Sequence, residues 1–198
     1  MIVALYQPGR TPAEIVSIQD AIQRIQKGPT GWLVARHLLD QPTRGQQDDR
    51  ARFFGALAVI VKLNSERSVG PAAVRCSPAN SPASSKLSDD EAREVLQNLL
   101  RWLVATPTDG SGTLSVHKLT QALVTYFIHF SHLWPHCIWH VLLCLDAQRC
   151  VPLDEVGDAP ESAKLAARLG LPGLRVALAF VNTLVDDVGR TEMTSPQL

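Results

Sequence analysis

Histidines and cysteines gather in one stretch of the sequence, between residues 129 and 150. Within it, His136, His140 and Cys144 recur every four residues, so a continuous helix would place them on one face, where imidazole and thiolate ligands suit zinc. The same spacing arises from any polar stripe on an amphipathic helix, and no Cys-X-X-Cys pair accompanies it. We therefore predict no metal ion and no other cofactor, with a zinc-dependent helical protein as the alternative.

Two further patterns look chemical but lack an essential group. Residues 109–115 are similar to the middle of an EF-hand loop, yet Pro107 and Lys118 occupy the first and twelfth positions, where calcium needs oxygen ligands. Cys137 and His140 are close enough in sequence to form a nucleophile and its base, although free cysteine is more often a small buried apolar residue. Because no Ser or Cys lies in a recognisable nucleophile motif, the sequence predicts a protein that is not an enzyme.

The composition limits the classes of partner. The chain has 198 residues, 45% of them apolar, and its 19 basic and 19 acidic residues give a net charge of zero. It therefore lacks the basic field that draws proteins to nucleic acid or to an anionic membrane. No apolar run reaches the roughly 18 residues that cross a bilayer, and the cysteines suit reduced thiols. We expect a soluble intracellular protein without nucleic-acid or membrane partners.

Apolar residues at spacings of three and four predict that helices position these side chains, and no segment has the alternation of a strand. A capping box at Ser88 and Glu91 marks one helix start, and Pro135 is expected at the first position of another. The predicted helices cover residues 12–27, 30–40, 48–64, 88–105, 115–131, 135–147 and 172–188, with a shorter one over 161–169.

Residues 65–87 interrupt this pattern, because six Ser, three Pro and few large apolar side chains cannot offset the entropy of ordering. They predict a disordered insertion. It separates the helices of residues 1–64 from those of 88–190, and 191–198 form a tail. All of these helices are expected to belong to one solenoid domain.

Short turns between consecutive helices predict an all-α, HEAT/armadillo-type right-handed solenoid of about three to four repeats. The first helices of successive pairs begin near Pro12, Asp48, Ser115 and Pro172, and without the insertion the second interval is close to the roughly 40–47-residue HEAT period. A solenoid exposes one helix layer along its concave side, so exposed positions on the second helices are candidates for binding a partner. These candidates are Arg36, Arg93, Gln97, Arg101, His136 and His140.

Three runs resemble the N-terminal HEAT repeats of importin-β-type karyopherins, in the importin-thirteen and transportin-three branch. They are IQDAIQRIQKGPTGWLVARHLL, DDRARFFGALAVIVKLN and LTQALVTYFIHFSHLWPHCIWHVLLCL. Their motif residues are Trp32, Phe53, Phe54, Gly55, Ala56, Trp134 and Pro135. Since Gly55 costs about 1 kcal/mol in a helix interior relative to Ala, we expect a neighbouring helix to approach it closely.

The resemblance implies a function in nuclear transport. It implies that the chain is an N-terminal segment of a receptor that binds Ran in its GTP form, Phe-Gly repeats of nucleoporins and protein cargo. Such a receptor shuttles between cytoplasm and nucleus. The alternative is a general helical-repeat scaffold whose partners do not depend on Ran.

Overall fold

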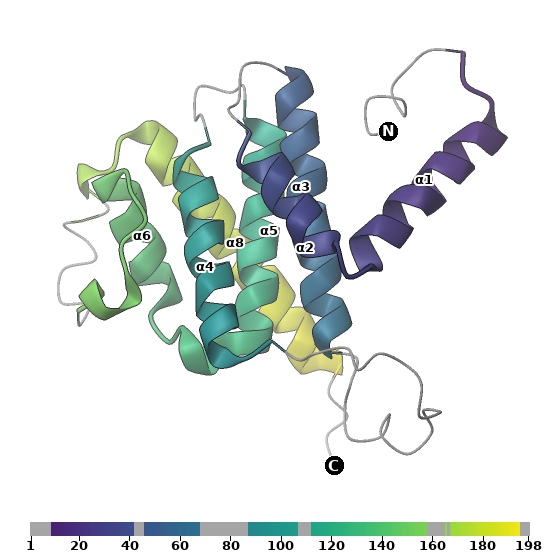
Figure 1. The fold of residues 1–198 in the computed structure, drawn as a ribbon. Coiled ribbons are helices and arrows are strands. Elements are labelled where there is room, and N and C mark those ends of the chain that lie inside the picture. Colours follow the sequence, from purple (N-terminus) through teal and green to yellow (C-terminus); the bar gives the residue numbers. More distant parts are fainter. Residues whose placement is uncertain are drawn as a thin grey trace, which may run out of the picture.

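Helices make up the regular structure in the part of the chain that the computed structural model describes, residues 9–41, 46–67, 87–106, 112–157, 165 and 167–194. No strand occurs among these residues, so the predicted all-α class is confirmed there. The α-helices in chain order (Figure 1) are α1 (Pro12–Lys27), α2 (Gly31–Leu39), α3 (Gln46–Arg67), α4 (Asp89–Val104), α5 (Thr113–Phe130), α6 (Cys137–Ala147) and α8 (Leu171–Thr194). The 3-10 turns η3 (Ser131–Leu133) and η4 (Leu153–Glu155) lie on either side of α6.

Most predicted helix bounds agree with the structure. The capping box before α4 is confirmed, because Glu91 N donates to Ser88 Oγ (3.3 Å) and Ser88 N donates to the Glu91 carboxylate (2.8 Å). α8 continues to Thr194, past its predicted end at residue 188. Most of the predicted helix over 161–169 lies outside the described residues, but residues 165, 167 and 168 within it are helical. Most of the predicted insertion over 65–87 also lies outside the described residues.

Pro135 is not the first helical residue, as the sequence predicted. It lies in a turn, His136 is the N-cap residue, and α6 begins at Cys137. The reason is the preceding η3 turn, after which Trp134 takes a non-helical conformation (φ −138°, ψ 58°) that directs its side chain into the core. The chain returns to helical geometry only after the buried Trp134, at Cys137.

The helices form two layers (Figure 1). α2, α4 and α6 make up one layer, and α3, α5 and α8 make up the other. In the second layer α3 packs on α5 and α5 packs on α8, while α4 packs beside α6 in the first. α1 contacts α2 and α3 at the end of both layers.

The pairing of helices across the layers differs from the predicted one. α2 pairs with α3, α4 with α5, and α6 with α8. The sequence paired the helices over 115–131 and 135–147 as one hairpin, but α5 and α6 share little contact because the chain crosses between layers at η3 and α6 then packs on α8. A short connection between two consecutive helices therefore does not predict that they pack against each other.

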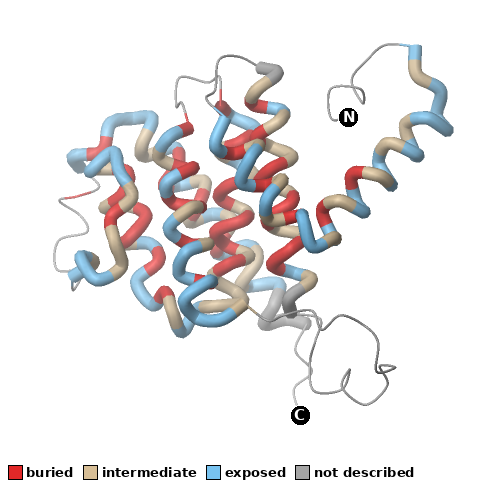
Figure 2. The backbone as a smooth tube through the Cα atoms, viewed as in Figure 1, coloured by how far each residue is buried: buried red, intermediate tan, exposed pale blue. Residues whose placement is uncertain are grey.

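Buried residues concentrate where the two layers face each other (Figure 2). α5 lies at the centre, and its Leu119 and Leu123 are fully buried, as is Leu96 of α4. α1 contributes much less, since Ile22 and Gln26 are its buried residues. Burial of apolar surface therefore holds α3, α4 and α5 together more strongly than it holds α1.

Arg52 of α3 is buried, with 3% of its surface exposed, and it joins the C-terminal ends of two helices of the other layer. Its Nη1 donates to the carbonyls of Leu39 and Gln41 at the end of α2. Its Nη2 donates to the Trp102 carbonyl (3.2 Å) and to Thr106 Oγ1 (2.9 Å) at the end of α4. The guanidinium thus satisfies carbonyls that a helix end leaves without intrahelical donors.

Asp49 of α3 accepts hydrogen bonds from free N–H groups at a helix N-terminus, just as Arg52 donates to free carbonyls at helix C-termini. Its buried carboxylate accepts hydrogen bonds from Leu114 N (3.2 Å) and Ser115 N (3.0 Å), and the Ser115 hydroxyl donates to it as well. A negative charge at the first turn of α5 is favoured by the free N–H groups and by the helix dipole. Asp49 and Arg52 therefore tie α3 to α2, α4 and α5.

The predicted close approach at Gly55 is confirmed. A Cβ atom added there would lie 2.9 Å from Leu39 Cγ, closer than real Cβ contacts, and 3.2 Å from the Ala35 carbonyl oxygen of α2, closer than most of them. Within the same motif Ala56 is buried, and the rings of Phe53 and Phe54 meet edge to face at 5.5 Å. The motif is therefore a packing surface between α2 and α3.

Replacing Gly55 with Ala should destabilise the protein in spite of alanine's better helix propensity. The propensity gain of about 1 kcal/mol is smaller than the cost of the clash, because Leu39 and the α2 backbone must move to make room for the methyl group. In Gly189→Ala, where no atom lies within 4 Å of the added Cβ, only the gain remains. Urea denaturation should give a lower midpoint for Gly55→Ala and a higher one for Gly189→Ala, and equal shifts would contradict the packing argument.

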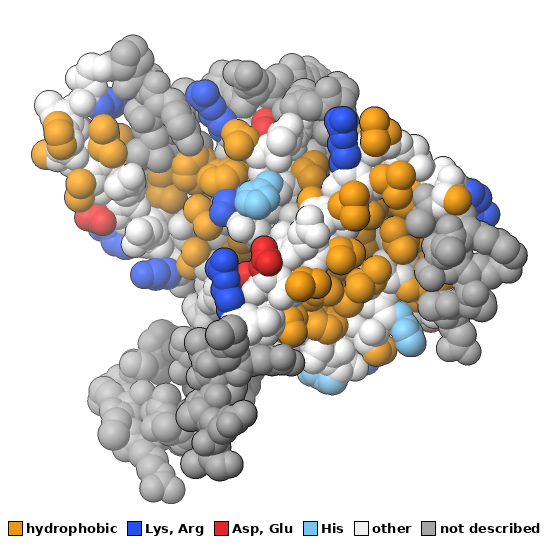
Figure 3. All heavy atoms as spheres, turned by 180° about the vertical axis from the view of Figure 1, so that it is seen from behind, with side chains coloured by type: hydrophobic (Ala, Val, Ile, Leu, Met, Phe, Trp, Pro, Cys, Tyr) orange, Lys and Arg blue, Asp and Glu red, His pale blue; other side chains and the backbone are white. Residues whose placement is uncertain are grey.

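The face behind the view of Figure 1 carries a band of apolar side chains (Figure 3). Its exposed members on α8 are Leu171, Leu178 and Val185, which recur every seven residues along one side of the helix. The opposite side of α8 packs on α5 and α6. Within the described residues, no helix covers this outer side of α8.

Candidate partner-binding face

Five of the six residues predicted to contact a partner are exposed on one layer, that of α2, α4 and α6. Arg36 is on α2, and His136 precedes α6. Arg93, Gln97 and Arg101 follow one side of α4 at four-residue spacing. The structure thus brings these five positions to a common face, although the sequence assigned them to a different set of helix pairs.

Ion pairs connect part of this face. Asp40, just after α2, accepts from Arg101 Nη2 (3.0 Å) and Trp102 Nε1 (2.8 Å), and Arg36 Nε lies 3.6 Å from its other oxygen. Arg36 also lies 3.9 Å from Glu94 of α4. Exposed pairs of this kind contribute only about 0–1 kcal/mol, so a partner's charged groups can replace them at small cost.

A groove of about 210 Å³ lies between α2 and α4 beside these ion pairs. Its apolar part comes from Trp32, Leu33 and Val95, and Leu33 is the most exposed, at 69%. The remaining lining residues are Arg36, Leu87, Glu91, Glu94, Asn98 and Trp102. The groove is smaller than the roughly 300–1,000 Å³ of small-molecule sites, which suits one side chain of a protein partner.

No protein-family model, curated protein or solved structure matches this chain. The resemblance to importin-β-type karyopherins therefore rests on the three sequence runs quoted above. None of the described helices combines the length and the hydropathy that a bilayer-crossing segment requires.

His140 is not on the exposed face where the sequence placed it. It is fully buried, its Nδ1 accepts from Trp134 Nε1 (3.0 Å), and its Nε2 donates to the Val151 carbonyl (2.6 Å). Burial lowers the pKa of His140, so the ring is neutral at physiological pH. Because both ring nitrogens are used within the core, His140 holds the loop after α6 in place and presents no group to a partner.

The buried His140 should make stability depend on pH. As the pH falls below about 6.5, the unfolded chain binds a proton that the folded chain does not bind until its lower pKa is reached, so stability falls through that window. The contribution is at most about 1.4 kcal/mol per pH unit. Urea denaturation across this range measures it. His140→Asn should flatten the dependence and His136→Ala should keep it, and the opposite outcome would contradict the assignment.

The described residues do not form the cysteine–histidine nucleophile or the zinc site considered in the sequence analysis. Cys137 is buried and burial raises the pKa of its thiol, while His140 has no free nitrogen with which to deprotonate it. Across the described ranges, no three His, Cys, Asp or Glu side chains are grouped so that they could hold a metal ion. His136, His140 and Cys144 do not form the face that zinc binding would need, because the first is exposed and the other two are in the core.

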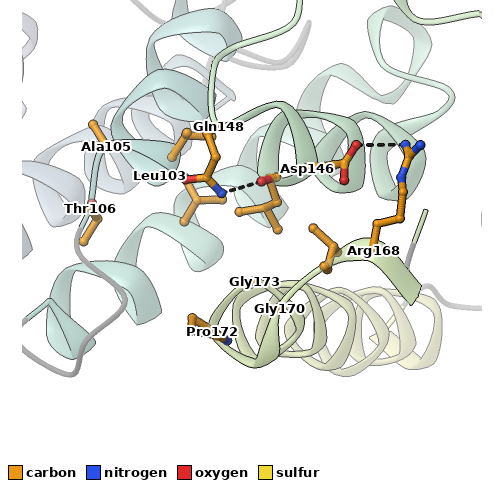
Figure 4. A pocket seen from close by; sticks show the side chains of 12 residues that line it. Leu103, Ala105, Thr106, Asp146, Gln148, Arg168, Gly170, Pro172 and Gly173 are labelled. Atoms are coloured by element: carbon orange, nitrogen blue, oxygen red, sulfur yellow. Dashed lines mark hydrogen bonds and ion pairs between the residues drawn. The ribbon is translucent and has the colours of Figure 1, made fainter.

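A larger hollow of about 390 Å³ lies between the C-terminal ends of α4 and α6 and the start of α8 (Figure 4). Its charged groups are Asp146 and Arg168, which pair with each other at 2.9 Å. Gln148 donates to the Leu145 carbonyl (2.6 Å) at its wall. With these polar groups satisfied within the protein, the hollow shows no arrangement for acid–base or nucleophilic chemistry.

The sequence did not predict the apolar part of the α2–α4 groove. Of its residues, only Trp32 is among those singled out above, as part of the karyopherin-like motif. The signal lay in the adjacent Trp32 and Leu33 of a nine-residue helix, which cannot bury both against one neighbour.

Proposed function

We propose that this chain is the N-terminal segment of an importin-β-type nuclear transport receptor, built as a right-handed HEAT-type solenoid. The main support is that three successive helix pairs, α2/α3, α4/α5 and α6/α8, add to both layers in chain order, as solenoid repeats do. The three quoted sequence runs supply the link to transport. In this proposal the segment binds Ran-GTP, nucleoporin repeats and protein cargo while the receptor shuttles between cytoplasm and nucleus.

The packing within each layer supports an assignment of the concave and convex sides of the proposed solenoid. α5 packs closely on both α3 and α8, whereas α2 and α4 meet mainly where Arg101 and Trp102 reach Asp40. A two-layer stack curves toward the layer whose helices lie closer together. We therefore propose that α3, α5 and α8 lie on the concave side and the exposed arginines of α2 and α4 on the convex side, whereas the sequence analysis expected these arginines on the concave side.

Ran binding tests this proposal. Immobilised Ran loaded with GTP should retain the 198-residue chain, and Ran loaded with GDP should not. Lys118→Glu, which reverses a charge on α5, should weaken the retention several-fold, while Arg93→Glu on the other layer should leave it unchanged. Equal retention by both nucleotide states, or none, would favour the helical-repeat scaffold without Ran dependence.

The α2–α4 groove is the proposed site for a phenylalanine of a Phe-Gly repeat. Its apolar wall, its size and its position on the convex layer support an aromatic side chain with solvent-exposed neighbours. A synthetic Phe-Gly repeat peptide should bind the chain and should lose most of its affinity to Leu33→Asp. Val16→Asp changes a similarly exposed apolar residue on α1 and is the matched control. Equal affinities for the two variants would exclude the groove.

A further inference from the structure

Two cysteine thiols meet at the C-terminal end of α6. Cys144 is buried in the helix, and Cys150 lies just beyond it with part of its side chain exposed. Between them Gln148 adopts the left-handed conformation (φ 51°, ψ 29°), which turns the chain back toward the helix. As a result Val151 N, which follows Cys150 in the chain, donates to Cys144 Sγ (3.3 Å), so the Cys144 sulfur lies beside the backbone of Cys150.

The surroundings of Cys150 favour its thiolate. The neighbouring Cys144 thiol stabilises the charged form, and the guanidinium groups of Arg101 and Arg149 add positive charge, which together lower the pKa of Cys150 below its ordinary value. The Cys150 thiol, when protonated, donates to the Gln97 carbonyl of α4 (3.5 Å). Cys150 therefore forms the nucleophilic thiolate more readily than an ordinary cysteine.

Cys144 has the properties of the second partner. The pKa of Cys144 is raised, because of its interaction with the neighbouring Cys150 and because it is buried. Val151 N donates to its sulfur (3.3 Å), which fixes the side chain beside the loop. Cys144 is thus protected from solvent oxidants and remains available to react with an oxidised Cys150.

We propose that Cys144 and Cys150 form a dithiol site that hydrogen peroxide converts to an intramolecular disulfide. The turn at Gln148 that brings the two residues together, the partial exposure of Cys150 and the burial of Cys144 distinguish this pair from Cys137, which is buried in α6. The site is independent of the proposed transport function.

The reaction balances with peroxide as the only oxidant. The Cys150 thiolate attacks one peroxide oxygen, the O–O bond breaks, and the departing hydroxide takes a proton to become water, leaving Cys150 as a sulfenic acid. The Cys144 sulfur then attacks the Cys150 sulfur, and the displaced hydroxide leaves as water with the Cys144 proton. Two thiols and one peroxide thus give one disulfide and two waters.

Intact mass spectrometry of the full 198-residue chain tests the proposal. After reduction and exposure to hydrogen peroxide, the mass should fall by two hydrogens, and peptide mapping should find Cys144 linked to Cys150. Every sample should also carry Cys76→Ser, which removes the cysteine that lies outside the described part of the chain. The matched control is Cys137→Ser, which should form the same disulfide.

Two variants separate the roles of the sulfurs. Cys150→Ser should lose the disulfide and react with peroxide much more slowly. Cys144→Ser should instead accumulate a sulfenic acid at Cys150, which a dimedone adduct at that residue would reveal. Circular dichroism would verify that both variants are folded. Equal oxidation rates at Cys137 and Cys150, or an unlinked pair in the folded wild-type chain after complete oxidation of Cys150, would overturn the proposal.

Discussion

Replacing Arg52 with Met should lower the free energy of unfolding by about 2–4 kcal/mol, because buried acceptors at two helix ends lose their donors. Methionine keeps the unbranched stem and the helix propensity of arginine, so the change mainly removes the guanidinium. The affected carbonyls belong to Leu39, Gln41 and Trp102. Urea denaturation followed by circular dichroism measures the difference.

Two variants show whether the fork of the guanidinium is responsible. Arg52→Lys keeps the charge, but one ammonium group cannot reach the ends of α2 and α4 together, so it should recover only part of the loss. Arg175→Met removes an exposed arginine from α8 and should change stability by less than about 0.5 kcal/mol. If Arg52→Met cost no more than Arg175→Met, the hydrogen bonds of Arg52 would not be stabilising the fold.

The helices themselves could be predicted because the signals that define them are local. The apolar spacing of α1 and the capping box of Ser88 and Glu91 each lie within a few residues, and the structure confirms both. Gly55 could be predicted as a contact because its helix cost required a compensating approach, although the sequence did not say that α2 makes it. Signals within a few residues therefore predict the helices, without information on the helices that pack against them.

The buried polar contacts of α3 depend on residues far away in sequence. Arg52 contacts Trp102 and Thr106 some 50 residues later, and no pattern within α3 identifies such partners. One signal was present. Asp49 and Arg52 lie on the same helix face as the buried Ala56, so charged residues aligned with an apolar stripe indicated buried, paired charges.

His140 shows how a four-residue spacing misleads. The helix around it is apolar on almost every side, so the stripe through His136, His140 and Cys144 is not the polar face of an amphipathic helix. A histidine in such a helix is better interpreted as a buried residue with two hydrogen-bond partners. The partners, Trp134 and Val151, are supplied by the connections at the two ends of α6.

Trp134 should be the most costly single residue to remove. Its buried ring lies 6.0 Å from Tyr126 of α5, 5.9 Å from Phe180 of α8 and 6.1 Å from His140 of α6, measured between ring centroids. Truncation to Ala should lower the free energy of unfolding by about 3–5 kcal/mol, since it opens a cavity where three helices meet. Trp32→Ala at the half-buried groove is the control and should cost much less.

Trp134→Phe separates the packing of this residue from its hydrogen bond. Phenylalanine keeps an aromatic ring in the cluster but removes the donor to His140 Nδ1, so the imidazole can accept a proton there more readily. The pKa of His140 should then move up toward its ordinary value, and the loss of stability below about pH 6.5 should become smaller than in the wild type. Urea denaturation of both proteins over the same pH series measures the two curves. An unchanged pH dependence would show that the indole donor does not hold His140 neutral, and that burial alone does so.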